Sequence, residues 1–324
     1  MIMNYYQLTP DAIADALMSV GIHVDSGLMA LNSYENRVYR FKSDTDGPLV
    51  AKFYRPQRWS RQQIQEEHDF LFASANAGVR VAVPLKREQS SIFSYNNMLF
   101  AVWPAISGRQ LETDNLDQLE AFGEQVARLH QVGAGLTLTH RPQLTTDDYL
   151  LRARAVLQQQ AQIPKTLSAA FFKQLDAVIE RASALYQPRQ QLSIHCDCHA
   201  SNILWNDGPW LLDFDDCRTG PAVQDLWMML SGSRQEQLMQ LDTLLAGYEN
   251  VREFDNAELA LIEPLRAMRI VNYMAWLAAR WSDPAFPLNF PWFNTEEYWQ
   301  QQLGVLAEQL QHLNAAPLSL TSWN

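Results

Sequence analysis

The residues best suited to chemistry lie between positions 195 and 216 of this 324-residue chain. Two apolar triplets, residues 203–205 and 210–212, flank a turn rich in Asn, Asp, Gly and Pro, a pattern that predicts a β-hairpin. If its strands pair symmetrically about the turn, Asn202 lies opposite Asp213, roughly 4.5–5.5 Å away. An amide oxygen and a carboxylate at that separation can hold a hard divalent cation such as Mg²⁺.

A third polar residue, Asp197, lies on the loop that enters the hairpin, where it could reach a substrate hydroxyl. A base, an Asn and an Asp around magnesium are the parts that phosphoryl transfer needs. An isolated loop Asp is more often a cap or turn residue, but its offsets from Asn202 and Asp213 favour the catalytic interpretation. Asp215 could contact a second metal ion, a substrate group or only solvent, and Asp216 is expected to be structural.

The same segment offers a competing interpretation as a zinc site. His195-Cys196-Asp197-Cys198-His199 contains several side chains that zinc commonly takes as ligands. They alternate too closely to converge on one tetrahedron, and structural zinc sites usually add a second ligand pair far along the chain. Zinc is therefore disfavoured. The two thiols that flank Asp197 leave open the hypothesis that activity is sensitive to oxidation.

A second group of candidate residues lies in the first third of the chain. Lys52 falls in an expected strand, residues 49–54, and Glu67 falls in an expected helix, residues 61–76. Glu67 is three residues after Ile64 and four before Leu71, so it belongs to the apolar stripe of that helix. A buried acid usually has a partner, and Lys52 is the natural one. A solvated lysine and an acid at the edge of the stripe remain the alternatives.

The motif around Asp197 resembles that of aminoglycoside phosphotransferase-like kinases, usually written His-Gly-Asp-x-His-x-Gly-Asn and followed by Asp-Phe-Asp. The chain departs from it at Cys196 and Ser201, where a Cβ narrows the backbone angles that Gly allows. The resemblance covers nearly the whole chain and narrows to the bacterial stress response kinase A family. The runs that carry it are residues 31–39, 52–56, 220–228 and 262–269.

This resemblance implies a two-lobed, protein-kinase-like α+β fold. A small, mainly antiparallel β N-lobe would span residues 1–104, and a larger, mainly helical C-lobe would span residues 105–324. ATP and Mg²⁺ would bind between the lobes, with Asp197 as the base and Asn202 and Asp213 as metal ligands. Asp213 would thereby also serve catalysis.

The resemblance also assigns roles around the nucleotide. Lys52, held by Glu67, would contact the phosphates. The chain has no Gly-x-Gly-x-x-Gly and no Walker A sequence. In similar kinases the turn at residues 32–36 covers the phosphates instead, and here Ser33 and Asn36 could donate to them; a solvated turn is the alternative.

Two further residues would hold the loop that carries the base. In similar kinases the histidine at the position of His195 bonds backbone near the metal-binding Asp. Asp225 would be a buried acid that ties the loop backbone in place, although it could instead cap a helix.

The residues indicate phosphoryl transfer to an alcohol, and the resemblance implies a serine/threonine protein kinase acting in bacterial stress response. Its partners would be proteins with Ser or Thr hydroxyls, including itself. A small-molecule kinase for an aminoglycoside, choline or a sugar uses the same motifs and stays the alternative. A nucleotide-binding regulator without chemistry is disfavoured, because every expected catalytic residue is present.

Composition narrows the functional class further. The net charge of −11 argues against nonspecific binding to nucleic acid or to an anionic membrane. No apolar run approaches the ~20 residues that span a bilayer, and the first six residues do not resemble a signal peptide. The three cysteines do not suggest a disulfide framework. A cytoplasmic monomer is expected.

The remaining elements can be placed from local patterns. A helix is expected from Thr9 to about Gly21, and strands are expected at residues 27–32, 37–42, 79–83 and 98–103. Residues 103–108 should form the hinge, and the chain beyond residue 110 should be mostly helical. Two features stay open. Arg266 and Arg269 could meet an acidic substrate or pair with nearby acids, and residues 280–292 could be packing or a wall of the cleft.

Overall fold

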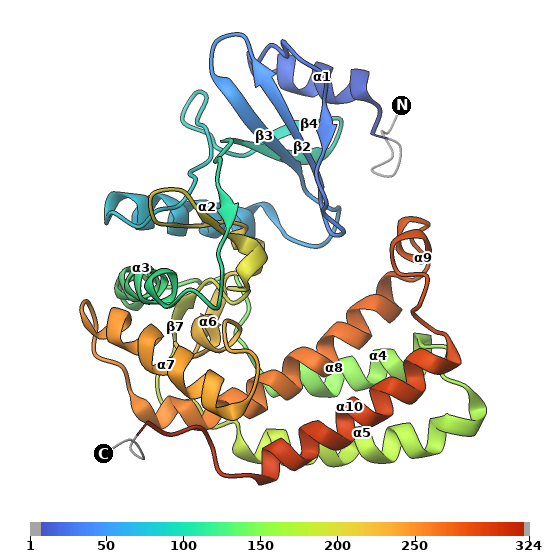
Figure 1. Cartoon of the computed structure of the whole chain (residues 1–324). Coiled ribbons are helices and arrows are strands. Elements are labelled where there is room, and N and C mark those ends of the chain that lie inside the picture. The colour runs from blue at the N-terminus through green and yellow to red at the C-terminus, as the bar shows by residue number, and fades with distance from the viewer. Residues whose placement is uncertain (1–7, 321–324) are drawn as a thin grey trace.

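The computed structural model describes residues 8–320, and it has two lobes (Figure 1). The expectation about a signal peptide falls on residues outside this range. The N-lobe is an antiparallel sheet with strand order β1-β2-β3-β5-β4. Its strands are β1 (Met29–Ala30), β2 (Arg37–Ser43), β3 (Gly47–Phe53), β4 (Phe93–Tyr95) and β5 (Met98–Pro104).

One face of this sheet is covered by α1 (Pro10–Met18), which begins as expected with Thr9 as its cap and Pro at its first position. Leu49, Ala51 and Phe53 of β3 point to this face and share a buried cluster with α1. The alternation of the strand therefore turns Lys52 to the opposite face, toward the cleft.

The helix α2 (Arg61–Asn76) lies between the sheet and the C-lobe (Figure 1). Ser60 and Gln63 form a capping box at its start, so the helix begins and ends where the sequence predicts. Ile64 packs with residues of the sheet, whereas Phe70 and Leu71 belong to the large core of the C-lobe. Since α2 contributes to both cores, it fixes Glu67 at the boundary between the lobes.

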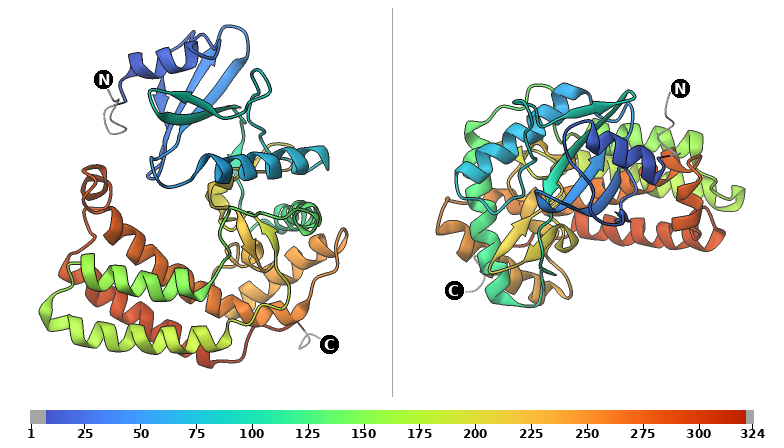
Figure 2. Two further views of the ribbon diagram at one scale, coloured as in Figure 1. Left: turned by 180° about the vertical axis from the view of Figure 1, so that it is seen from behind. Right: turned by 90° about the horizontal axis from the view of Figure 1, so that it is seen from above.

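The C-lobe is mainly helical. Its helices are α3 (Leu116–Gly135), α4 (Ala153–Gln160), α5 (Lys165–Leu185), α6 (Gln224–Trp227), α7 (Arg234–Glu249), α8 (Ile262–Arg280), α9 (Ala285–Asn289) and α10 (Glu296–Asn314), with a π-helical turn at Asp147–Arg152 and 3₁₀ turns at Ala200–Asn202, Phe214–Asp216 and Asn256–Leu261. Figures 1 and 2 show α4, α5, α8 and α10 packed side by side as a bundle. Two short antiparallel sheets lie beside it, and they hold the candidate catalytic segments.

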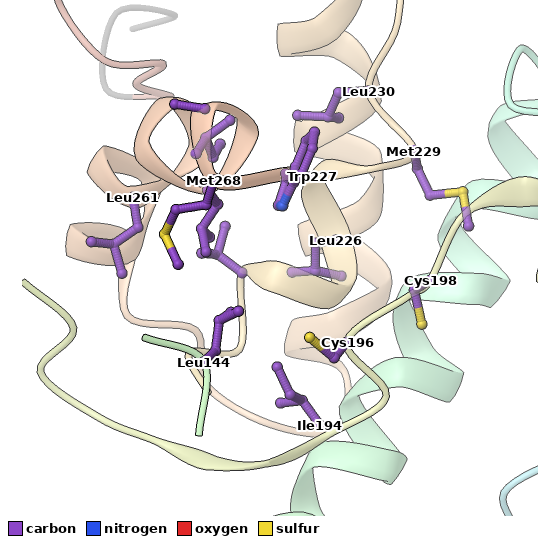
Figure 3. Packing of buried hydrophobic residues seen from close by; sticks show 14 of the residues in the cluster. Leu144, Ile194, Cys196, Cys198, Leu226, Trp227, Met229, Leu230, Leu261 and Met268 are labelled. Atoms are coloured by element: carbon purple, nitrogen blue, oxygen red, sulfur yellow. The ribbon is translucent and has the colours of Figure 1, made fainter. Parts of the chain in front are cut away.

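The first short sheet pairs β7 (Leu192–Ile194) with β10 (Arg218–Gly220), and the second joins β6 (Arg109–Gln110), β8 (Ile203–Trp205) and β9 (Pro209–Leu211). The loop between β7 and β8 rests on a buried apolar cluster (Figure 3). Cys196 and Cys198 contribute their side chains to this cluster together with Leu226 and Met229. The loop is thus supported from below by close packing.

The predicted α+β kinase-like class is confirmed, but some elements differ. Residues 79–83 do not join the sheet: Val79 and Val81 pack into the C-lobe core, and Val81 makes a single parallel bridge to Leu211. The strand predicted at residues 79–83 is therefore wrong. The apolar side chains that suggested it pack against the C-lobe core and do not belong to a strand of the sheet. The strands β4, β7 and β10 were not predicted, since each has only three residues. No helix within residues 8–320 is long and apolar enough to cross a bilayer.

Two glycines set the separation of α3 and α7. A Cβ at Gly123 would overlap the carbonyl oxygen of Leu244, and a Cβ at Gly247 would overlap that of Glu120. Each helix therefore presents a glycine to the backbone of the other. This contact also brings Tyr248 of α7 within hydrogen-bond distance of His130 of α3.

We expect Gly247→Ala to lower the free energy of unfolding by about 1–3 kcal/mol, because the helices must separate to admit the methyl group. Gly304→Ala on α10 is the matched control, since nothing lies within 4 Å of the added Cβ. The control should gain about 0.5–1 kcal/mol. Urea denaturation of both variants measures the difference, and equal stability of Gly247→Ala and wild type would contradict this account of the helix contact.

Candidate active site

A cavity of about 870 Å³ lies between the lobes. Most of its lining comes from the turn between β1 and β2, the loop after β7, the segment after β9 and one face of α8, and residues before α2, in and just before the π-helical turn, and at the start of α6 contribute the rest. Five of the residues predicted from sequence line it together, namely Ser33, Asn36, Asp197, Asn202 and Asp213. The structure thus brings together residues that are separated by as many as 180 positions in the chain.

The hairpin forms, but the register predicted for it is wrong by one residue. Ile203 pairs with Leu211, and Leu212 donates its N–H to the carbonyl of Asn202 (2.9 Å). The cause is a shorter loop: Asp207 and Gly208 have positive φ, which lets Pro209 enter the strand.

Asn202 and Asp213 are consequently not opposite each other, yet both line the cavity. Asp213 has a left-handed backbone (φ 58°, ψ 69°) at the end of β9, and Asn202 closes a 3₁₀ turn before β8. Asp is among the residues that tolerate this conformation. Local backbone geometry, rather than strand pairing, presents the two side chains to the same cavity.

Lys52 is the charged group that joins the lobes at this site. Its Nζ lies 3.0 Å from Asp213, 3.5 Å from Asp215 and 3.7 Å from Glu67. Burial alone would lower the pKa of Lys52, but the charges of Asp213 and Glu67 raise it well above its ordinary value. The ammonium therefore stays charged in the closed cleft.

The predicted ion pair between Lys52 and Glu67 is present, and Glu67 is almost completely buried (1% exposed). Its second oxygen accepts from Arg141 (2.9 Å), a residue that sequence reasoning missed. Arg141 follows α3 and also donates to the carbonyl of Asp215. No spacing signal could have found it, because the contact depends on how α3 and α2 pack.

Asp215 is not the solvated acid that one interpretation of the sequence allowed. It is buried, and the charges of Lys52 and Arg58 outweigh burial and lower its pKa below the ordinary value. Its Oδ1 atom accepts no hydrogen bond, and the amide oxygen of Asn202 accepts none from residues 8–320. Asp216 instead pairs with Arg58 (3.0 Å) and Arg218 (3.1 Å), as expected for a structural acid.

Asp197 lies at the floor of the cavity. Its carboxylate contacts Arg269 Nη1 (2.7 Å), His199 Nε2 (3.4 Å) and Asn202 Nδ2 (3.4 Å). Burial would raise the pKa of Asp197, but the hydrogen bond with His199 and the charge of Arg269 lower it below its ordinary value. The group is therefore a carboxylate throughout the neutral range.

The backbone of this loop is held as the resemblance implied. Asp225 is fully buried and accepts from the N–H groups of His195 (2.8 Å) and Cys196 (2.7 Å), and it contacts His130 (3.0 Å). His195 Nε2 lies 2.7 Å from the carbonyl of Leu212. One acid and one imidazole thus connect the loop before Asp197 to the segment before Asp213.

The turn at residues 32–36 is fixed by contacts of its own. Ser33 Oγ accepts from the N–H of Asn36 (3.4 Å). Asn36 is buried, and its side-chain oxygen accepts from the N–H of Arg55 (3.1 Å). The turn is therefore attached to the segment that follows β3.

Glu35 fastens this turn to the C-lobe and was missed by sequence reasoning. It pairs with Arg58 (2.8 Å) and Arg280 (3.1 Å) and accepts from the indole of Trp276. A second link joins Arg55 to Asp283 (2.9 Å). These contacts close one end of the cavity over α8.

The features left open by the sequence are now placed. Arg269 pairs with Asp197, whereas Arg266 pairs with Glu263 (3.3 Å) and does not line the cavity. Within residues 280–292, Arg280 lines the cavity, and Phe286 and Phe290 pack against Trp276 of α8. The segment is therefore mainly packing that supports one wall.

Cys196 has a positive φ (71°) at the position where similar kinases have Gly. Its thiol and that of Cys198 point into the apolar cluster beneath the loop (Figure 3). Burial raises the pKa of Cys196 to about 12 and that of Cys198 well above its ordinary value. Because the thiolate is the reactive form, both side chains should be inert.

We therefore expect the rate of the enzyme to be insensitive to a mild thiol oxidant under native conditions. Phosphotransfer measured with and without the oxidant tests this, and thiol titration in denaturant provides the control that all three cysteines are reduced at the start. A loss of rate that a thiol reductant reverses would restore the oxidation hypothesis.

Comparison with known proteins agrees with this geometry. Residues 28–262 match the family described as the phosphotransferase enzyme family. Stress response kinase A of Escherichia coli (strain K12) is 49% identical over 319 residues, covering 98% of this chain and 97% of the relative. The serine/threonine protein kinase RdoA of Salmonella typhimurium (strain LT2) is 48% identical over the same coverage.

Solved structures show the same fold at low sequence identity. A microcompartment-associated aminopropanol kinase superposes with a TM-score of 0.70 at 17% identity, covering 94% of this chain and 96% of that one. Amicoumacin kinase in complex with AMP-PNP, Ca²⁺ and Ami gives a TM-score of 0.68 at 19% identity, covering 90% of each chain. The chain is an ATP-dependent phosphotransferase that belongs to the phosphotransferase enzyme family and, within it, to the stress response kinase A family.

Proposed function

We propose that the protein is an ATP- and Mg²⁺-dependent serine/threonine protein kinase that acts in bacterial stress response. The observation that carries the proposal is that Asp197, Asn202 and Asp213 line one cavity between the lobes, and that Lys52 contacts Asp213 there (3.0 Å) without lining the cavity itself. The names of the relatives, stress response kinase A and serine/threonine protein kinase RdoA, support a protein as acceptor.

The donor set fits a magnesium ion. Magnesium prefers oxygen ligands and keeps waters or phosphate oxygens in the remaining positions. Asn202 and Asp213 are the proposed ligands, and the buried Oδ1 of Asp215, which accepts no hydrogen bond and lies 3.5 Å from the Lys52 ammonium, belongs to the same cavity lining. When bound, the ion would neutralise charge on the phosphates. Lys52 would contact the phosphates, and Glu67 would hold Lys52 in place.

The turn that carries Ser33 and Asn36 is proposed to cover the nucleotide. Both residues line the cavity. Ser33 is the stronger candidate for a direct phosphate contact, because Asn36 is buried and its side-chain oxygen already accepts from Arg55. Asn36 would then act by shaping the turn.

Asp197 performs the role of the base in this mechanism. Its carboxylate accepts a hydrogen bond from the acceptor hydroxyl and orients that oxygen for in-line attack. The oxygen–phosphorus bond to the acceptor forms as the bond to ADP breaks, and the hydroxyl proton passes to Asp197. Because the pKa of Asp197 is below its ordinary value, Asp197 assists the early part of the reaction more by orienting the acceptor hydroxyl than by removing its proton.

We place the lobe boundary between residues 104 and 105, because β5 ends at Pro104 and the next strand, β6, pairs with β8 of the C-lobe. We further propose a monomer in the cytoplasm, where ATP is supplied. Its partners would be proteins with Ser or Thr hydroxyls, including itself, rather than nucleic acid or membrane.

A small-molecule O-phosphotransferase is the second candidate. The solved structures of similar fold include the aminopropanol kinase and a spectinomycin phosphotransferase, whose names give small acceptors. Incubation with labelled ATP separates the two candidates, because label appears on protein in one case and on a small molecule in the other.

We expect Asp197→Asn to lower the rate of transfer by about 10²–10⁴-fold, because the variant cannot accept the hydroxyl proton. Transfer of labelled phosphate to a Ser- or Thr-containing protein measures the rate. The affinity for ATP and the melting temperature should stay near wild type. A variant that keeps wild-type turnover would remove Asp197 from the mechanism.

We expect Asp213→Ala to weaken nucleotide binding in magnesium buffer by roughly tenfold or more, because a metal ligand is lost. Isothermal titration with a non-hydrolysable ATP analogue, with and without Mg²⁺, measures the change. Asp216→Asn is the matched control, since Asp216 follows in the same segment but pairs with Arg58 and Arg218. Equal magnesium dependence in wild type and Asp213→Ala would argue against the site.

A further inference from the structure

One face of α8 forms a continuous wall of the cavity. Its residues Arg269, Asn272, Tyr273, Trp276 and Arg280 all line the cavity, and their spacing places them on one side of a helix. At a rise of 1.5 Å per residue the wall is roughly 16 Å long. It begins at Asp197, which Arg269 contacts, and ends at Glu35, which Arg280 contacts.

The chemistry of this wall is basic and aromatic. It holds two arginines, one amide and two aromatic rings, and no acid. Tyr273 and Trp276 stack at 5.7 Å between ring centres with 22° between planes, and Tyr273 is 43% exposed. This surface therefore borders the part of the cavity that contains Asp197.

Acids elsewhere in the cavity are already paired with cations of the chain. The pairs are Glu35 with Arg58 and Arg280, Asp148 with Arg152, Asp213 with Lys52, and Asp216 with Arg58 and Arg218. Each of these acids therefore has its charge at least partly compensated by a cation of the chain.

Within this wall, Arg269 has N–H donors that are not used in hydrogen bonds to the described residues. Its side chain is 44% exposed, and Nη1 donates to Asp197 (2.7 Å). A guanidinium has five N–H donors, and this one makes no other hydrogen bond within residues 8–320. The remaining N–H donors of this guanidinium can therefore bind an anionic group beside Asp197.

We propose that Arg269 is a specificity-determining residue, which selects acceptor segments with a carboxylate next to the Ser or Thr hydroxyl. The acceptor is thus an acidic peptide segment lying along the wall, and this inference rests on the proposed protein kinase function. A lysine in the same position of the acceptor would place like charges together, which is costly.

Two serine peptides test the selection, identical except that Asp residues flank the serine in one and Lys residues in the other. Wild type should prefer the acidic peptide by about tenfold in kcat/KM, mainly through KM, which corresponds to about 1.4 kcal/mol. Arg269→Glu should remove or invert this preference, and Arg269→Lys should keep it. Because Arg269 also contacts Asp197, absolute rates fall in its variants and the ratio between peptides is the readout.

Arg266→Glu is the matched control. Arg266 lies one turn earlier on α8, pairs with Glu263 and sits over the Trp227 ring, away from the cavity. This variant should keep the wild-type preference. An equal rate for the two peptides in wild type, or an unchanged ratio in Arg269→Glu, would overturn the assignment.

Failure of the proposed function can be told apart from failure of this inference. If neither peptide is phosphorylated, the protein kinase function is wrong for such acceptors. A binding measurement then decides the inference. Fluorescence anisotropy, with an ATP analogue present, compares how tightly the same two labelled peptides bind to wild type and to Arg269→Glu. Tighter binding of the acidic peptide that depends on Arg269 supports it, and equal binding contradicts it.

Discussion

The arrangement of the site depends on one buried ammonium group held among three carboxylates. Lys52 comes from the sheet, Glu67 from the helix between the lobes, and Asp213 and Asp215 from the C-lobe. Without partners, the charges of Lys52, Glu67 and Asp215 would be costly to bury, whereas the Asp213 side chain is half exposed. The lobes therefore meet where these carboxylates pair with Lys52, Arg58 and Arg141, and the cavity lies at that meeting point.

A second layer of interactions keeps the reactive loop in shape. Asp225 accepts two backbone N–H groups, and the side chains of Cys196 and Cys198 pack into the core below. The exposed polar residues of the loop are thus supported by backbone hydrogen bonds to Asp225 and by close packing of the two cysteine side chains. Such rigid support lets Asp197 and Asn202 keep a defined geometry without a substrate.

Sequence patterns predicted α2 and the pairing of Lys52 with Glu67, because these follow from local periodicity and capping, and the family resemblance implied the fold class. They failed where geometry depends on a single turn, as in the hairpin register, which changed with positive φ at Asp207. Arg141, Glu35 and Arg269 could not be assigned, since their partners lie far away in sequence.

The left-handed backbone at Cys196 has a consequence for how the catalytic segment could evolve or be engineered. A glycine adopts that conformation without cost, whereas a cysteine must be forced into it by its surroundings. The backbone conformation of this segment therefore depends on the packing of the surrounding domain. Grafted into a different scaffold as an isolated cassette, it would relax to another conformation, while the glycine-bearing version could be transplanted more readily.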